Sequence, residues 1–88
     1  MVRKKFPYFY GVNDEPDESL FKKQCAAIER HIPNLKKEKL LEDVDGSSIQ
    51  IYYHEKGEVR VCNDYCYGDL YVESDFDLLP YFGGGNEC

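Results

Sequence analysis

Residues 48–73 alternate between apolar and polar side chains in three short runs. Alternation with a period of two is typical of a β-strand that buries one face, and the β-branched and aromatic residues of these runs favour strands. Gly57 and Gly68 lie between the runs, where tight turns favour residues that adopt positive φ. We therefore expect an antiparallel meander of three strands. The residues expected to face its packing partner are Ile49, Ile51, Tyr53, Leu70 and Val72, and those expected on the opposite face are Gln50, Tyr52, His54, Asp69, Tyr71 and Glu73.

A helical repeat precedes the meander and predicts an α-helix over residues 17–31. Asn13 or Asp14 is expected to accept hydrogen bonds from the free amides at its start. Pro33 is expected to end it, because a residue that precedes proline favours extended geometry. The apolar stripe of this helix, with spacings i, i+4, i+7 and i+11, consists of Phe21, Cys25, Ile28 and Ile32.

Packing this helix on one face of the meander buries both apolar surfaces. The predicted fold class is α+β, with one main helix packed on an antiparallel three- to four-stranded meander in two layers. Residues 4–12 are a candidate edge strand, because Pro7 cannot donate a hydrogen bond inside a sheet. Residues 34–44 fit either a short helix, slightly favoured by their Lys, Glu and Leu content, or a strand.

The chain is short enough to form one domain. We assign residues 1–82 to a single α+β domain and residues 83–88 to a flexible Gly-rich tail. Between the meander and this tail, Ser74 and Asp75 are expected to cap a short helical turn that contains Leu78 and Leu79.

The net charge of −6 is unevenly distributed along the chain. Residues 1–44 contain nine Lys or Arg and eight Asp or Glu, whereas residues 45–88 contain two and nine. An acidic half repels nucleic-acid phosphates and anionic lipids and attracts cationic partners. We therefore expect a basic protein partner, no direct nucleic-acid binding and no membrane association. Acidity that serves solubility alone is the competing explanation.

The four cysteines do not predict disulfides. MVRKKFPYFY at the N-terminus has no apolar segment typical of a secretory signal, so we expect a cytoplasmic protein with free thiols. Cys62 and Cys66 form one loosely spaced pair, and the possible further zinc ligands are Cys25, His31 and His54. A structural zinc site usually needs two close pairs. We expect no cofactor and no metal, and since no catalytic motif is present we expect no enzymatic activity.

Tyrosines interleaved with carboxylates are the strongest functional feature of the sequence. Tyrosine buries a large area at low entropic cost in interfaces, and nearby carboxylates complement Lys and Arg of a partner. About half of these rings are expected to complete the core instead. The predicted partner-binding residues are Tyr52, Tyr65, Tyr67, Asp69, Tyr71, Glu73, Asp75 and Asp77.

In size, acidity and aromatic content the chain is similar to immunity proteins of bacterial nuclease toxins and to phage-encoded inhibitors that imitate the charge of DNA. The similarity rests on these overall properties and on no family motif. The sequence therefore predicts a small acidic inhibitor that occludes a basic nuclease or another nucleic-acid-binding protein. The alternatives are a small zinc-binding module and a subunit of a larger assembly.

Overall fold

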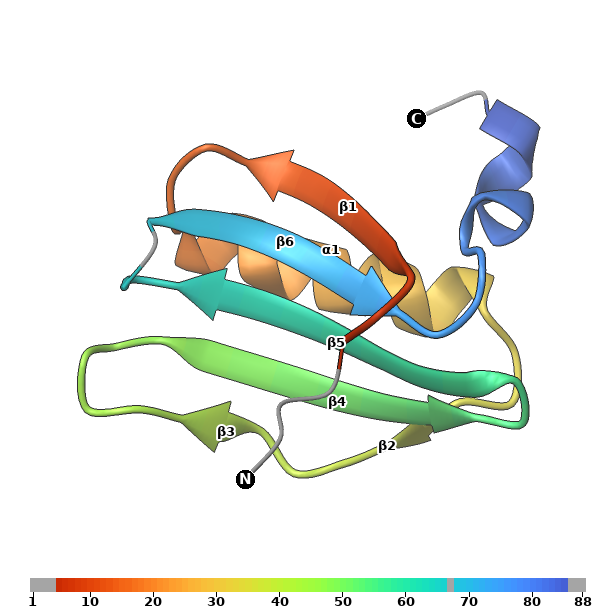
Figure 1. Cartoon of the computed structure of the whole chain (residues 1–88), viewed down its shortest axis with the longest axis horizontal. Coiled ribbons are helices and arrows are strands. Elements are labelled where there is room, and N and C mark those ends of the chain that lie inside the picture. The colour runs from red at the N-terminus through yellow and green to blue at the C-terminus, as the bar shows by residue number, and fades with distance from the viewer. Residues whose placement is uncertain (1–4, 67, 86–88) are drawn as a thin grey trace.

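One α-helix packs on one face of an antiparallel β-sheet in a computed structural model that describes residues 5–66 and 68–85 (Figure 1). The helix is α1 (Glu18–His31). The sheet has six strands in the order β1-β6-β5-β4-β2, and β3 also pairs with β4. Their bounds are β1 (Tyr8–Asn13), β2 (Lys36–Lys37), β3 (Leu41–Glu42), β4 (Ser48–His54), β5 (Gly57–Asp64) and β6 (Asp69–Ser74). The two-layer α+β fold is as expected, but the sheet has more strands than the three or four predicted.

Helix α1 begins and ends close to the residues that the sequence indicates. Its N-cap is Asp17, whose side chain accepts a hydrogen bond from the amide of Leu20, so the capping role expected for Asn13 or Asp14 was wrong by three or four positions. Ile32, before Pro33, has extended φ and ψ of −110° and 114° and ends the helix. Phe21, Ile28 and Ile32 are buried against the sheet, which confirms the predicted apolar stripe.

Two tight turns connect the meander β4–β5–β6. Gly57 and Gly68 have φ of 143° and 79°, the backbone region that favours glycine. Strand β4 pairs with β5 from Ser48↔Asn63 to His54↔Gly57, and β5 pairs with β6 from Val59↔Ser74 to Asp64↔Asp69. The central meander is therefore continuous and antiparallel, as predicted.

The additional strands lie at the two margins of the sheet. Strand β1 pairs with β6 and is an edge strand, in agreement with the expectation for residues 4–12. Residues 34–44 form no helix: β2 and β3 are two short strands on the outer side of β4, and the amide of Glu38 between them donates to Ile51 O at 2.9 Å. Backbone pairing with β4 therefore overrides the slight helical preference of this segment.

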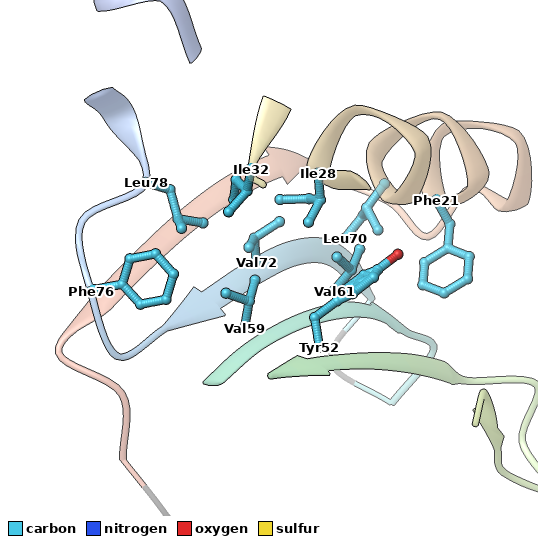
Figure 2. Packing of buried hydrophobic residues seen from close by; sticks show 10 residues of the cluster. All are labelled: Phe21, Ile28, Ile32, Tyr52, Val59, Val61, Leu70, Val72, Phe76 and Leu78. Carbon is cyan, nitrogen blue, oxygen red and sulfur yellow. The ribbon is translucent and has the colours of Figure 1, made fainter. Parts of the chain in front are cut away.

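The core lies between α1 and the sheet and contains Tyr52, contrary to the face predicted for β4 (Figure 2). Register places Tyr52 beside Val59 and Gln50 beside Val61, and all four are buried. Tyr53 is exposed and Ile49 and Ile51 are half-buried, since these three residues point to the open face of the sheet. The remaining cluster of buried apolar residues is formed by Phe21, Ile28, Ile32, Val59, Val61, Leu70, Val72, Phe76 and Leu78.

Hydrogen bonds explain why β4 directs its polar residues inward. The hydroxyl of Tyr52 donates to Glu29 Oε2 at 2.6 Å, and Lys37 Nζ lies 3.1 Å from the same oxygen. The side-chain amide of Gln50 donates through Nε2 to Glu38 O at 2.6 Å. Both side chains extend from the core toward partners at its margin, so their polar atoms are satisfied although the residues are buried.

The segment after β6 ends in a 3-10 helix, η1 (Leu79–Gly85). Its start differs from the predicted turn, because Asp77 Oδ1 accepts from the amide of Leu79, whereas Ser74 Oγ bonds to the backbone of Phe76. Residues 83–85, assigned to the tail, belong to η1, and residues 86–88 lie outside the described part of the chain. None of the helices in the described residues has the length and apolar character needed to cross a bilayer.

Candidate functional site

Three acidic segments converge at one end of the sheet, which we call the acidic end (Figure 1). They are residues 13–18 between β1 and α1, residues 42–47 between β3 and β4, and residues 63–69 between β5 and β6. Within these segments the sequence has no Lys, Arg or His. Their nine carboxylate residues are Asp14, Glu15, Asp17, Glu18, Glu42, Asp43, Asp45, Asp64 and Asp69.

Hydrogen bonds connect the three segments to one another. The amide of Tyr65 donates to Ser47 Oγ at 2.8 Å, and the Tyr65 ring lies over Gly46, where an added Cβ would come within 3.7 Å of Cδ1. The amide of Asp17 donates to Oδ1 of the buried Asn63 at 2.9 Å. The turns and the start of α1 therefore form one connected surface, with less conformational entropy to lose on binding than separate loops would have.

Some of these carboxylates also stabilise their own turns. Asp45 Oδ1 accepts from the amide of Ser47 at 2.9 Å, and Asp64 Oδ1 accepts from the amide of Cys66 at 2.8 Å. The hydrogen bond from Ser47 holds the pKa of Asp45 below its ordinary value. The Asp45 carboxylate is thus ionised at neutral pH, and the hydrogen bonds fix the direction of both side chains.

Exposed apolar side chains accompany the charges. Val44, at the tip of the β3–β4 turn, is fully exposed, and Tyr65, at the tip of the β5–β6 turn, is 47% exposed. Aromatic residues are enriched in protein interfaces, where a polar rim surrounds them. The acidic end can therefore offer both charge complementarity and apolar contact to a partner.

A hollow of about 190 Å³ lies on the open face of the sheet beside the acidic end. Its wall includes four carboxylate residues and one cationic residue, Arg60, as well as Cys62; the carboxylates are Asp43, Asp45, Asp64 and Glu73. Burial raises the pKa of the Cys62 thiol to about 12, so at neutral pH the sulfur is protonated and is a poor nucleophile. Because carboxylates outnumber the cationic residue of this wall, the hollow suits a cationic group better than it suits nucleophilic chemistry at Cys62.

The predicted partner-binding residues fall into separate parts of the molecule. Tyr65 and Asp69 lie at the acidic end, and Tyr67 lies outside the described residues. Tyr71 and Glu73 are on the open face, but Tyr71 is buried beneath the ring of Phe9, with the ring centroids 5.0 Å apart. Tyr52 is in the core, and its expected exposure was wrong because β4 presents its other face to solvent.

Asp75 and Asp77 lie beyond the opposite end of β6 and have structural partners. Asp75 Oδ2 accepts from the amide of Glu58 at 2.8 Å, which connects it to the start of β5. Asp77 Oδ1 accepts from the hydroxyl of Tyr10 at 2.9 Å. The eight predicted residues therefore do not form one surface.

Sequence reasoning missed most of the acidic end. Six of its carboxylate residues lie in residues 1–44, the half of the chain in which the charges balance. The available signal was their position, because acidic residues concentrate in the three connections that meet at this end of the sheet. The missed residues include Glu15, Glu18, Glu42 and Asp43.

The candidate zinc ligands are dispersed. Among the described residues, no group of three or more His, Cys, Asp and Glu side chains is placed to hold a metal ion. His54 is at the β4–β5 turn, where its Nδ1 accepts from the amide of Lys56, whereas Cys62 pairs with Ile49 toward the other end of β4. His31 lies at the end of α1 against Phe82.

Comparison with known proteins found no match to a protein-family model, to a curated protein or to a solved structure.

Proposed function

We propose that this chain is a non-enzymatic inhibitor that binds a basic nuclease or another nucleic-acid-binding protein through its acidic end. The observation that carries the proposal is the convergence of nine carboxylate residues from three connected segments that contain no cationic residue. A protein surface that binds nucleic acid is rich in Lys and Arg, and this acidic end complements such a surface in charge.

The charges of the other end of the sheet are mixed, which distinguishes it from the acidic end. The β4–β5 turn contains both Glu55 and Lys56, Arg30 lies in the last turn of α1, and Asp75 and Asp77 follow β6. The acidic end, in contrast, has carboxylates and no cationic residue in its three segments, so the negative field is strongest there. Such a field orients the acidic end toward a cationic surface before contact and raises the association rate.

The mechanism we propose is occlusion. Carboxylates of the acidic end occupy the positions of nucleic-acid phosphates on the partner, while Tyr65 and Val44 contact its apolar atoms. Association is then fast at low ionic strength and slows as salt screens the charges, since the Debye length is about 10 Å at 0.1 M salt. We place this interaction in the cytoplasm, where the free thiols of Cys25, Cys62 and Cys66 remain reduced.

The test compares two charge-reversal variants. Glu18→Lys with Glu42→Lys changes the acidic end, and Glu38→Lys with Glu55→Lys changes acids outside its three segments. Each double variant changes the net charge from −6 to −2, so the two are matched in overall charge. Reversal of Glu18 removes a favourable interaction with the start of α1 of about 0.5 kcal/mol, and thermal unfolding verifies that both variants are folded at the assay temperature.

Wild type and the two double variants are immobilised and used to capture basic proteins at low salt. Each captured protein is then tested for DNA binding or cleavage in the presence of the free chain. We expect wild type and the Glu38/Glu55 variant to capture and inhibit the same protein, and the Glu18/Glu42 variant to associate about tenfold more slowly. Equal association of the two variants would contradict binding through the acidic end. A captured protein that still engages DNA when saturated with the chain would contradict occlusion.

A further inference from the structure

The chain crosses the open face of the sheet before it enters β1. Tyr8 begins β1 at the margin of the sheet, where it pairs with Ser74 of β6. Two residues earlier, the ring of Phe6 lies over Arg60 of β5, with Arg60 Cζ 5.0 Å from the ring centroid. The chain therefore passes over β6 and reaches β5 on the face opposite α1 (Figure 1).

The contact between Phe6 and Arg60 fixes the position of the chain on this face. Arg60 Nε donates to Glu58 Oε2 at 2.6 Å, and the Arg60 side chain is only 31% exposed. An aromatic ring over a partly desolvated guanidinium is a favourable cation–π contact. Arg60 also belongs to the wall of the hollow on the open face. The described chain therefore begins beside this hollow.

The hollow is within reach of residues 1–4, which lie outside the described part of the chain and which we call the basic segment. Its wall follows β5 from Arg60 to Asp64, a distance of about 13 Å at the rise of a strand. An extended chain advances about 3.4 Å per residue, so Lys4 and Arg3 lie at most about 7 and 10 Å beyond the aromatic contact. Their long side chains add to this reach, which therefore covers the length of the wall.

The basic segment and the hollow have opposite charges. Arg3, Lys4 and Lys5 are the only three consecutive cationic residues in the sequence, and residues 1–12 contain no Asp or Glu. The wall of the hollow has four carboxylate residues and one cationic residue. The charge of that cationic residue is already matched by Glu58, which is not part of the wall. Electrostatic attraction therefore favours the basic segment as the occupant of the hollow.

The geometry points to the basic segment as a built-in competitor that binds the hollow through ion pairs of Arg3 and Lys4 with its carboxylates. A short tether gives such a segment an effective concentration of about 1 mM or more, so the segment competes with cationic groups from other molecules. The consequence for partner binding rests on the proposed function: a basic partner must displace the segment before its own Lys or Arg side chains enter the hollow. The contact itself does not depend on that function.

Two variants of equal charge test the contact in the full chain. Arg3→Gln with Lys4→Gln removes the charges of the basic segment, and Lys22→Gln with Lys23→Gln removes two exposed charges of α1, on the other layer. Each double variant loses two positive charges, so the net charge changes from −6 to −8 in both. In NMR spectra we expect the first variant to shift the amide signals of the wall of the hollow and the second to leave them in place.

A peptide of six arginines is the probe for competition, and titration at low salt locates its binding through the same amide signals. We expect the Arg3/Lys4 variant to bind this peptide about two- to tenfold more tightly than the Lys22/Lys23 variant, because two exposed ion pairs no longer compete for the hollow. The difference should shrink as salt is added, since salt screens exposed charges. Thermal unfolding verifies that both variants are folded.

The outcomes separate this contact from the proposed function. Unchanged wall signals in the Arg3/Lys4 variant, or equal affinities of the two variants for the peptide, would overturn the inference and leave the proposed inhibitor unaffected. Failure of wild type to capture a basic protein would contradict the proposed function and not the contact, which is measured in the chain alone. With a captured partner, the Arg3/Lys4 variant should associate faster than the Lys22/Lys23 variant, and equal rates would overturn the competition.

Discussion

Removal of the Tyr52 hydroxyl tests the position of β4 relative to α1. In the structure the ring is fully buried and its hydroxyl donates to Glu29 Oε2 at 2.6 Å, beside Lys37. Burial, reinforced by the bond to Glu29, raises the pKa of the phenol far above its ordinary value, so this hydroxyl is a donor at every relevant pH. We expect Tyr52→Phe to be less stable than wild type and to retain the fold.

The magnitude follows from the partner of the hydroxyl. A hydrogen bond to a charged group contributes about 1.5–3 kcal/mol when its loss leaves the charge without a donor. The side chain of Glu29 is 40% exposed and keeps Lys37 as a partner, so water replaces part of what is lost. We therefore expect a loss of about 1–1.5 kcal/mol, which lowers the Tm of a domain of this size by roughly 5–10 °C.

The pH dependence of this loss provides a second measurement. The hydrogen bond from Tyr52 holds the pKa of Glu29 below its ordinary value of 4.5, so the interaction stabilises the ionised carboxylate. The contribution of this hydrogen bond to stability is therefore fully present above the pKa of Glu29 in the unfolded state. It is lost as the pH falls through the lower pKa of Glu29 in the folded state. The difference in stability between wild type and Tyr52→Phe should shrink as the pH is lowered below about 4.5.

Urea unfolding followed by circular dichroism measures both effects. Tyr53→Phe is the matched control, because Tyr53 is the next residue and is exposed on the other face, and it should change stability by less than about 0.5 kcal/mol. Glu29→Gln combined with Tyr52→Phe should show a smaller loss than the two single variants added together. Equal effects at positions 52 and 53, or a larger effect at 53, would refute the assigned orientation of β4.

Two further predictions concern the β4–β5 turn and the cysteines. Gly57→Ala should destabilise the protein by about 2 kcal/mol or more, because the added Cβ would lie 2.4 Å from Asp75 Cβ at a φ of 143°. Gly11→Ala is the control and should have a stability within about 0.5 kcal/mol of wild type in the same thermal melts. A similar loss of stability in both variants would contradict this reason. Alkylation of the native protein at pH 8, mapped by mass spectrometry, should modify the exposed Cys66 and leave Cys62 unmodified until the chain is unfolded, because burial raises the pKa of Cys62 to about 12. Rapid modification of Cys62 in the folded protein would contradict its buried position.

Local patterns were sufficient for the elements at the centre of the fold. The repeat of Phe21, Ile28 and Ile32 located α1, because a helix that packs on a sheet must repeat its apolar residues with its own period. Gly57 and Gly68 located the turns of the meander, because these turns require positive φ. Both signals depend on residues that are close in sequence.

The orientation of β4 could not be read in the same way, because the two faces of this strand are almost equally apolar. Ile49, Ile51 and Tyr53 are more hydrophobic than Gln50 and Tyr52, which suggested the wrong face. The choice depends on the Tyr52 hydroxyl meeting Glu29, a contact across 23 positions. Strands β2 and β3 were missed for a related reason, since each has only two residues and exists through its pairing with β4.

The acidic end was only partly predictable for reasons of topology. Asp64 and Asp69 belong to the acidic half of the sequence, but Glu15 and Glu42 belong to the half in which charges balance. Whether those charges are neighbours depends on which loops share an end of the sheet, and this follows from the strand order β1-β6-β5-β4. The charge composition along the chain therefore identifies the acidic half of the sequence, but it assigns the residues of the acidic end to two different halves.

Turn formation alone does not account for the acidic end. Hydrogen bonds to backbone amides explain Asp17, Asp45 and Asp64, because aspartate is a common residue in caps and turns. Glutamate has a longer side chain and rarely serves in such turns, yet Glu15 and Glu42 are also exposed at this end.

Solubility does not require this concentration either, because negative charges dispersed over the surface would serve it with less mutual repulsion. Repulsion among nearby carboxylates opposes folding, so their convergence has a stability cost that dispersed acids would avoid. A surface that binds a cationic partner gains from the same concentration, since its field adds over all the charges. Glu15 and Glu42 are therefore the residues at which partner binding and turn geometry make different predictions. Glu18 also interacts favourably with the start of α1, so Glu42 is the position in the Glu18/Glu42 variant at which charge reversal separates the two explanations.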